Sequence, residues 1–181
     1  MEIRRGSYRT VFVLKKIVVK IPKQIYPWLK MFFKWLPRMI IAGRLKRHIR
    51  YCFESVFENW SEFVFYRKNK SYKLLVPTYF SAFGLINIQR YCEPLKMSHH
   101  DVWCQLLEKC GDVVWKDSHA FSNIDNFGVH EGKIQMVDYG SEETQEVLAI
   151  CAEKIFSDFD FSFSWEERKR QLQTQKESAK S

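Results

Sequence analysis

The stretch DSHAFSNIDNFGVHEGKIQMVDYG, residues 117 to 140, decides how the rest of this sequence is interpreted. Four acids and amides precede its alternating apolar segment: Asp117, Asn123, Asp125 and Asn126. The apolar segment then ends in a further acid, Asp138. A strand that delivers an aspartate into a turn can place a metal-holding carboxylate beside a second site on the preceding loop. This interpretation requires the rest of the chain to supply a nucleotide site.

The composition indicates a folded protein. The chain has 181 residues, of which 46% are hydrophobic and 16% aromatic. This length suits one domain, or one domain split into two small lobes, and the apolar content excludes a disordered chain. The five cysteines form no CxxC pair and no zinc-ligand spacing, and the start shows no secretory signal. We therefore expect reduced thiols and a cytoplasmic location.

Positive charge is concentrated at the start of the chain. Residues 1–50 hold fourteen lysines and arginines against one acid, Glu2, and so carry +13, whereas the remainder carries -5. Such a segment faces something anionic. ATP, an acidic or phosphorylated partner, a lipid surface and nucleic acid all have the required charge, and composition does not choose among them.

The first part of the chain predicts a β-hairpin. Residues 7–23, SYRTVFVLKKIVVKIPK, alternate and are rich in valine and isoleucine, with Lys15 and Lys16 at the expected tip. Gly6 lies just before the first strand, where a backbone without a side chain can approach a ligand closely. Lys20 lies inside the second strand. Alone, it has the simpler interpretation of a solvated lysine on an edge strand.

Residues 23–50 form a basic amphipathic segment. Its apolar residues recur at the three- and four-residue spacing of one helical face: Ile25, Trp28, Leu29, Phe32, Phe33, Leu36, Met39 and Ile40. Pro37 is expected to break or kink the helix. The aromatic face can either lie in a membrane interface, with lysines toward anionic headgroups, or pack on the core of the domain.

The middle of the chain predicts a helix followed by a strand pair. The helix covers roughly residues 48–68 and contains Glu62, which we expect to be half-buried and to need a cationic partner. Two strands follow within residues 72–95, with a turn near Phe83 and Gly84.

The remaining pattern is mainly helical. Residues 98–117 predict a helix with Asp101 near its start, and residues 126–140 a hairpin that turns at Glu131 and Gly132. Residues 142–156 predict a helix with Val147, Leu148, Cys151, Ile155 and Phe156 inward. The segment from Trp165 is a charged helix or disordered, and His99 and His100 are surface residues.

This succession of elements resembles the protein-kinase-like fold over about residues 3–140. The resemblance implies an α+β protein with two lobes. Residues 1–91 would form the antiparallel N-lobe with the basic insert at about 23–50, and residues 92–164 a minimal helical C-lobe. Residues 165–181 would be a charged tail.

The resemblance implies roles for residues of the N-lobe. In RRGSYRTVF only the middle glycine of GxGxxGxV is kept, as Gly6, with Arg4 and Arg9 in place of the flanking glycines and Val11 in register. Either arginine could contact phosphate instead of a glycine-rich loop. IVVKI resembles the VAIK strand, so Lys20 would hold the ATP phosphates with Glu62 as its helix partner. QRYC resembles the hinge that meets adenine, which makes Gln89 and Tyr91 candidate nucleotide-binding residues.

The resemblance also implies the metal and catalytic residues. MVDYG resembles the DFG motif, so Asp138 would bind Mg²⁺. The catalytic loop departs from HRDLxxxN, in which the asparagine follows the aspartate at five, because Asp117 is followed by Asn123 at six and by Asn126 at nine. DSH resembles the D-x-H form of small-molecule and bacterial kinases, so Asp117 would be the base and His119 a loop-shaping residue. Asn126 would bind the metal.

Two assignments in this loop have alternatives. Asn123 is the rival metal-binding amide, and Asp125 is the alternative base. Asp and Asn also stabilise turns before hairpins, so the loop has a purely structural interpretation as well.

The function that the resemblance implies is ATP- and Mg²⁺-dependent phosphotransfer to a hydroxyl of a protein, glycolipid or small molecule. One alternative is a nucleotide-binding pseudokinase that acts as an interaction module, and another is a basic protein that binds membrane surfaces. The expected partners are ATP and, through residues 1–50, an anionic membrane or an acidic protein. Binding to a membrane would make the protein peripheral there. Nucleic acid is not expected.

Only 43 residues follow Asp138, and they contain no APE-like anchor. The resemblance therefore implies a truncated lower lobe that needs no activation-loop phosphorylation.

Overall fold

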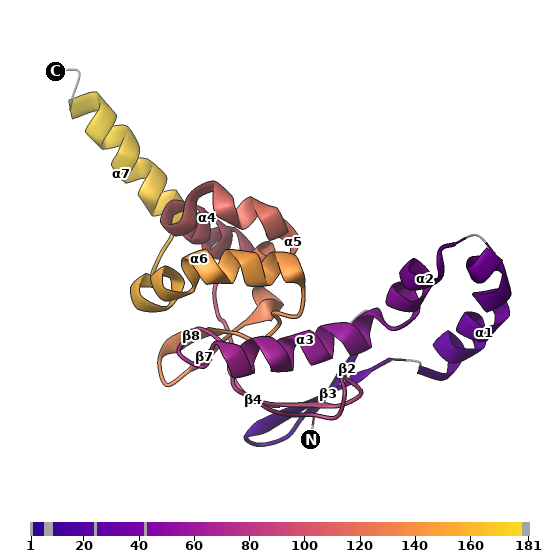
Figure 1. The fold of residues 1–181 in the computed structure, drawn as a ribbon. Helices are drawn as coiled ribbons and strands as arrows, with labels where there is room; N and C mark the ends of the chain where they lie inside the picture. The colour runs from indigo at the N-terminus through magenta and orange to yellow at the C-terminus, as the bar shows by residue number, and fades with distance from the viewer. Residues whose placement is uncertain (1, 6–8, 24, 42, 179–181) are drawn as a thin grey trace. The chain divides into compact units, whose positions relative to one another are not determined.

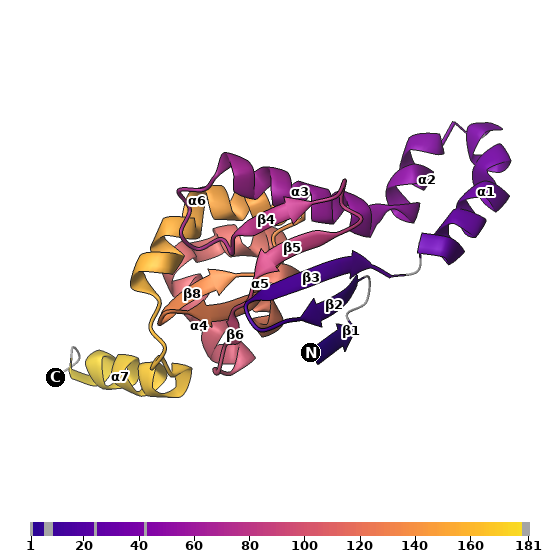
Figure 2. The same cartoon turned by 90° about the horizontal axis from the view of Figure 1, so that it is seen from below.

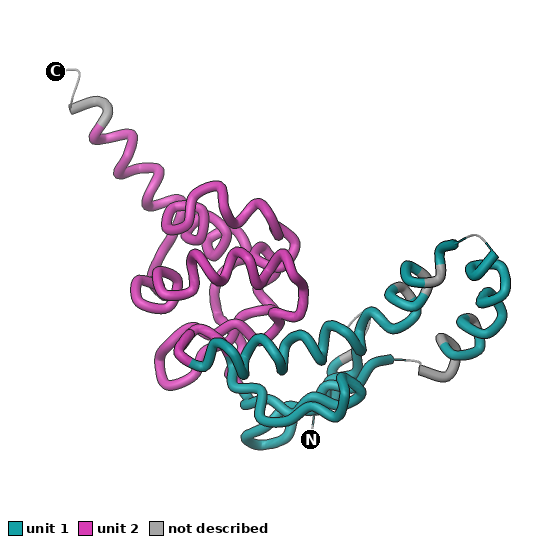
Figure 3. Tube along the Cα trace, in the orientation of Figure 1, with its two compact units in different colours: residues 1–70, 76–91 teal, residues 71–75, 92–181 magenta. Residues whose placement is uncertain are grey.

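The computed structural model describes residues 2–5, 9–23, 25–41 and 43–178. The chain divides into two compact units (Figure 3). Unit 1 comprises residues 1–70 and 76–91, and unit 2 comprises residues 71–75 and 92–181. The fold is α+β, as the sequence predicted, with antiparallel sheets and several helices.

Unit 1 contains a five-stranded antiparallel sheet (Figure 2). Its strands run in the spatial order β1-β2-β3-β5-β4, with these bounds: β1 Glu2–Arg5, β2 Arg9–Val13, β3 Ile17–Pro22, β4 Thr78–Ser81 and β5 Asn87–Arg90. The β2–β3 hairpin and the β4–β5 pair confirm the prediction, because alternating β-branched residues favour a half-buried strand. Strand β1 was not predicted. The strand β3 lies between β2 and β5, so Lys20 is not on an edge strand.

Three helices connect β3 to β4. They are α1 (Ile25–Ile41), α2 (Leu45–Cys52) and α3 (Glu54–Lys68). Helix α1 packs on α2, α2 on α3, and α3 crosses one face of the sheet against β3, β4 and β5 (Figures 1 and 2). Among the described residues, no helix combines the length and apolar character needed to cross a membrane.

One boundary prediction for these helices is wrong, and the break that was one of two alternatives at Pro37 is absent. The helix expected over residues 48–68 is divided at Phe53, whose backbone (φ -122°, ψ 19°) leaves the helical region between α2 and α3. Helix α1 does not break at Pro37 but continues to Ile41. A proline costs a helix one backbone hydrogen bond, and packing on α2 offsets that local loss.

Unit 2 is mainly helical. Its helices are α4 (His99–Cys110), the 3₁₀ helix η1 (Gly111–Asp117), α5 (Ser118–Ser122), the 3₁₀ turn η2 (Ile124–Asn126), α6 (Glu142–Asp158) and α7 (Trp165–Ser178). A three-stranded antiparallel sheet contains β6 (Glu93–Pro94), β7 (Phe127–His130) and β8 (Lys133–Met136), in that spatial order. The β7–β8 hairpin turns at Glu131 and Gly132 as predicted, and both residues have positive φ.

The core of unit 2 lies among α4, α6 and the small sheet. The predicted inward residues of α6 are buried, except Phe156, which is half-buried. They lie with other apolar side chains that are almost fully removed from solvent: Val102, Leu106, Val114, Phe121, Ile134 and Met136. Serine caps begin α4 and α6, because Ser98 accepts from the Asp101 amide and Ser141 from the Thr144 amide.

The β4–β5 turn is fastened to α3 through Gly84. This residue is buried and has a φ of 78°, which L-residues with side chains rarely adopt. Its N–H donates to Ser81 Oγ at 3.1 Å, and its carbonyl accepts from Asn59 Nδ2 at 2.9 Å. A Cβ atom at this position would overlap the backbone carbonyl oxygen of Val56. The turn therefore requires glycine for both conformation and space.

We predict that Gly84→Ala lowers the free energy of unfolding by about 3 kcal/mol, through the positive φ and the overlap together. The matched control is Gly43→Ala, which has a φ of 65° but no atom within 4 Å of the added Cβ, and should cost only about 1 kcal/mol. Urea unfolding followed by circular dichroism measures both. Equal losses in the two variants would show that close packing at Gly84 does not matter.

Candidate functional site

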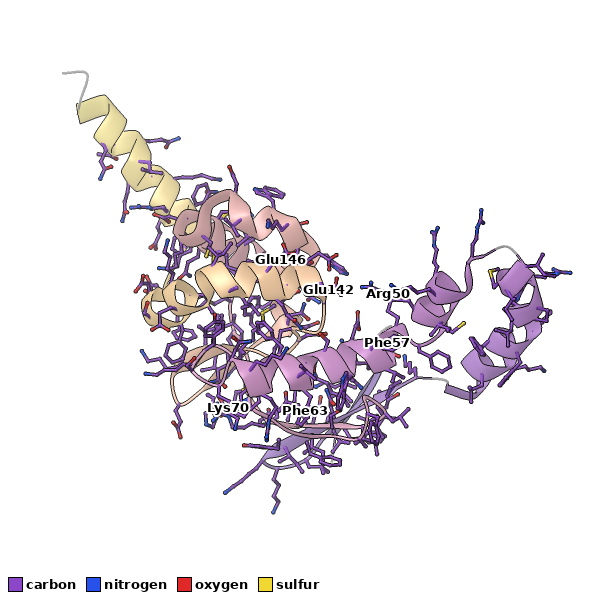
Figure 4. The ribbon with its side chains drawn as sticks, in the orientation of Figure 1. Arg50, Phe57, Phe63, Lys70, Glu142 and Glu146 are labelled. Carbon is purple, nitrogen blue, oxygen red and sulfur yellow. The ribbon has the colours of Figure 1, made fainter. Side chains whose placement is uncertain are left out.

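The carboxylate of Glu62 lies in the middle of α3 and is fully buried. Phe57 and Phe63, labelled in Figure 4, mark the helix that carries it. Lys20 Nζ donates to both of its oxygens, at 3.0 and 3.2 Å, and Arg9 Nη1 donates to Oε1 at 2.5 Å. Gln89 Nε2 donates to Oε2 at 3.0 Å. One carboxylate thus receives donors from three neighbouring strands of the sheet.

The Lys20–Glu62 pair is present as the sequence led us to expect, but in a different setting. Lys20 lies opposite Val11 on one side and Asn87 on the other, in the central strand β3. Its side chain is 7% exposed, and that of Glu62 is 0% exposed, so the expectation of a half-buried glutamate is wrong. A buried carboxylate needs several donors to offset desolvation, and the sheet provides them.

Arg9 is the member of this cluster that sequence reasoning missed. The sequence offered a phosphate contact for either Arg4 or Arg9; in the structure the Arg9 guanidinium lies against α3, where Nη2 also donates to Glu58 Oε2 at 3.0 Å. Arg4 instead pairs with the exposed Glu2. Arg9 and Val11 are two apart on β2, and Glu58 and Glu62 are four apart on α3. Residues two apart lie on one face of a strand, and residues four apart lie on one face of a helix. These spacings could have indicated the contact of Arg9 with the two glutamates of α3.

Charge within this cluster is balanced. The two cations, Lys20 and Arg9, meet the two carboxylates of Glu58 and Glu62. A buried cluster without net charge avoids much of the desolvation cost that an unpaired ion would carry. We call these four residues the Glu62 cluster.

Four further residues of unit 1 were expected to bind the nucleotide: Gln89, Tyr91, Val11 and Gly6. The Gln89 side chain is buried and also donates to Thr78 Oγ1 at 2.9 Å. The Tyr91 N–H donates to the Lys16 carbonyl at 3.0 Å. Val11 is half-buried on β2, and Gly6 lies outside the described residues. Their contacts with a nucleotide remain predictions.

In unit 2, Asn126 lies beside the segment that carries Asp138. The Val137 N–H donates to the Asn126 carbonyl at 2.8 Å, so the residue before Asp138 is held against the loop. Asn126 Nδ2 donates to the Ala120 carbonyl at 3.0 Å, which leaves Oδ1 as its atom suited to a metal. Amide and carboxylate oxygens are donors that Mg²⁺ accepts, so the two residues fit that ion chemically.

The rival amide, Asn123, has a structural contact. Its Oδ1 accepts from the Asp125 N–H at 3.1 Å and begins the turn η2. This is the turn chemistry that the sequence offered as an alternative for the loop. Among the described residues, no group of three or more His, Cys, Asp or Glu side chains is arranged to hold a metal.

Both oxygens of Asp117 accept hydrogen bonds. Oδ1 accepts from the Ala120 N–H at 3.1 Å and caps α5. Oδ2 accepts from Ser141 Oγ at 2.9 Å and from Thr144 Oγ1, at the start of α6. Asp117 therefore joins the starts of two helices, whereas the alternative base, Asp125, is exposed. His119 and the predicted surface histidines, His99 and His100, are also exposed.

The cysteines do not suggest thiol chemistry. All five are thiols that form no disulfide among the described residues, and four of them are buried. Burial, with a contribution from a hydrogen bond to Cys151, raises the pKa of the Cys110 thiol to about 12. A thiol with this pKa stays protonated at neutral pH, so Cys110 is a poor nucleophile.

No protein-family model, no curated protein and no solved structure matches this chain. The function of the protein is therefore inferred from the geometry within each unit.

We predict that Glu62→Ala lowers the free energy of unfolding by about 3 to 5 kcal/mol, because it leaves the buried Lys20 without its carboxylate and Arg9 with Glu58 alone. Glu58→Ala is the matched control: its side chain is 28% exposed and pairs with Arg9 at the margin of the cluster, so its loss should cost about 1 kcal/mol or less. Urea unfolding measured at one pH compares them. A Glu62→Ala protein as stable as Glu58→Ala would show that the buried carboxylate does not hold α3 on the sheet.

Proposed function

We propose that this protein is a phosphotransferase of the protein-kinase-like type, which uses ATP and Mg²⁺ to phosphorylate a hydroxyl group. The observation that carries the proposal is the ion pair between Lys20 on β3 and Glu62 on α3. A strand lysine held by a helix glutamate is the arrangement that protein kinases need in place before they bind ATP productively.

The order of elements supports the same proposal. Near the start of the chain lies the hairpin β2–β3, whose second strand carries Lys20. The helix α3 with Glu62 and the strand pair β4–β5 follow. Helix α4, a loop of acids and amides, the hairpin β7–β8 and the segment Asp138–Gly140 follow. This is the succession on which the sequence resemblance depends.

Each residue has a chemical task in the proposal. Lys20 would neutralise phosphate oxygens of ATP, and Glu62 would keep the lysine oriented. Asn126 and Asp138 would hold Mg²⁺, which neutralises phosphate charge when bound. Asp117 would accept or orient the proton of the incoming hydroxyl. Arg9, which shares the Glu62 carboxylate, would act with Glu62 as a positioning residue for Lys20.

A pseudokinase is the second candidate, and the contacts of Asp117 favour it. Both carboxylate oxygens already accept hydrogen bonds that join α5 to α6. A carboxylate with this structural task needs no catalytic task to explain its presence. In that case the fold would bind nucleotide without transferring phosphate.

We predict that the protein binds ATP in a Mg²⁺-dependent way and that Lys20→Met weakens this binding at least about tenfold, since one charge contact to phosphate is lost. Glu62 keeps Arg9 and Gln89 in that variant, so the fold should persist. Asp138→Asn should remove the Mg²⁺ dependence. Isothermal titration calorimetry with and without Mg²⁺ gives both values.

The matched control for this test is Lys15→Met, which changes an exposed lysine in the β2–β3 turn and should bind ATP like the unaltered protein. An unaltered protein that does not bind Mg-ATP would contradict the kinase-like proposal. So would a Lys20→Met variant with unchanged affinity.

We predict that Asp117→Asn lowers phosphotransfer or ATP hydrolysis by about a hundredfold or more while Mg-ATP affinity changes little. Asparagine keeps an acceptor for the α5 cap, so the variant tests basicity more than structure. Radiolabelled ATP turnover measures the rate. If Asp125→Ala shows this loss instead, Asp125 is the base and Asp117 is structural; an unaltered protein that binds ATP without turnover is a pseudokinase.

A further inference from the structure

Helix α1 exposes a stripe of apolar side chains. Phe33 is 65% exposed, Ile40 is 56% exposed and Ile41 is 87% exposed, and Pro37 is exposed between them. These four residues are spaced i, i+4, i+7 and i+8, which places them along one side of the helix. We call them the α1 stripe.

The α1 stripe is not the side of the helix that packs within unit 1. Leu29, Phe32, Leu36 and Met39 are half-buried, and the Phe32 ring meets that of Phe53 edge-on at 5.6 Å. The single apolar face predicted from the sequence is thus divided. One half faces α2 and the chain that follows it, and the other half, with Phe33 and Ile40, faces solvent.

Basic side chains flank the α1 stripe. Lys30, Lys34 and Arg38 are exposed at i, i+4 and i+8 on α1, and Lys34 and Arg38 each directly follow a stripe residue. Helix α2 adds three more exposed bases: Lys46, Arg47 and Arg50, the last labelled in Figure 4. Residues 23–50 contain eight lysines and arginines and no acid.

From this combination we infer that α1 and α2 form a docking surface for an anionic lipid bilayer. Exposed aliphatic and aromatic side chains gain free energy when they leave water, and the adjacent bases are attracted to negatively charged headgroups. A helix with an apolar side and a basic side lies in the plane of the interface rather than across it. This orientation agrees with the length and charge of α1.

The α1 stripe favours a bilayer over nucleic acid. Nucleic acid is bound mainly through charge contacts to phosphates, for which the exposed Ile40 and Ile41 would be unnecessary. A bilayer uses both halves of the pattern at once. The inference does not depend on nucleotide binding, because α1 and α2 contain no residue to which the proposed phosphotransfer assigns a role.

The test is co-sedimentation of the full chain with vesicles of phosphatidylcholine alone and of phosphatidylcholine mixed with phosphatidylserine. We expect binding to the mixed vesicles only, and its loss in 1 M salt, where the screening length falls to about 3 Å. The double variant Lys30→Gln/Lys34→Gln should bind roughly fivefold more weakly for each lysine removed.

The apolar contribution is tested separately with Phe33→Ser/Ile41→Ser, which should bind at least about tenfold more weakly. Because both side chains are exposed, circular dichroism of this variant should be unchanged. Ile150→Ser is the matched control: it removes an isoleucine that is 58% exposed on α6 of unit 2, and its binding should equal that of the unaltered protein.

Absence of binding to the mixed vesicles would overturn the inference. Binding that Phe33→Ser/Ile41→Ser leaves unchanged would also overturn it, because the surface would then be a purely electrostatic one. Duplex DNA or RNA can be added as a competitor. If it removes the unaltered protein and the Phe33→Ser/Ile41→Ser variant from the vesicles equally well, nucleic acid is the partner instead.

Discussion

The arrangement of unit 1 depends on one buried carboxylate. Glu62 accepts hydrogen bonds from side chains on β2, β3 and β5, so a single residue of α3 links three neighbouring strands. Asn59, one turn earlier, joins the same helix to the β4–β5 turn. Asn59 and Glu62, both polar, are the buried residues of α3, whereas Phe57 and Trp60 are exposed. Polar contacts therefore set the position of α3 on the sheet to an unusual degree, since helices commonly meet a core through an apolar stripe.

A carboxylate also organises the loop region of unit 2, through a different geometry. Asp117 caps α5 and accepts from two hydroxyl groups at the start of α6. Fixed hydrogen bonds of this kind hold side chains in place before a ligand arrives, which is a requirement of catalysis by positioning. The same contacts are sufficient to explain the residue structurally. The structural and catalytic interpretations of Asp117 therefore predict the same geometry. They differ in whether the carboxylate also accepts a proton from the incoming hydroxyl.

The two proposals assign different tasks to different elements. In the proposed phosphotransfer, nucleotide chemistry would belong to the Glu62 cluster and to the loops around Asn126 and Asp138. Lipid binding belongs to α1 and α2, which are inserted between the strand of Lys20 and the helix of Glu62. The charge distribution of the chain reflects this division, because the insert alone holds eight bases and no acid. A kinase-like protein held at an anionic bilayer would meet acceptors that are themselves at the membrane surface.

Local patterns in the sequence were sufficient for most elements. Alternation predicted the β2–β3 and β7–β8 hairpins, and helical spacing predicted α4 and α6, because these signals depend on neighbours two to four residues apart. The pairing of Lys20 with Glu62 was also expected, through the resemblance of the sequence to protein kinases. The tertiary structure alone decided that Lys20 lies in a central strand, since this depends on β5 pairing with β3 after some seventy intervening residues. It also decided that Arg9 shares the Glu62 carboxylate and that the apolar face of α1 is divided between α2 and solvent. Burial and ion pairing of these residues are set by contacts distant in sequence, and local periodicity contains no information about them.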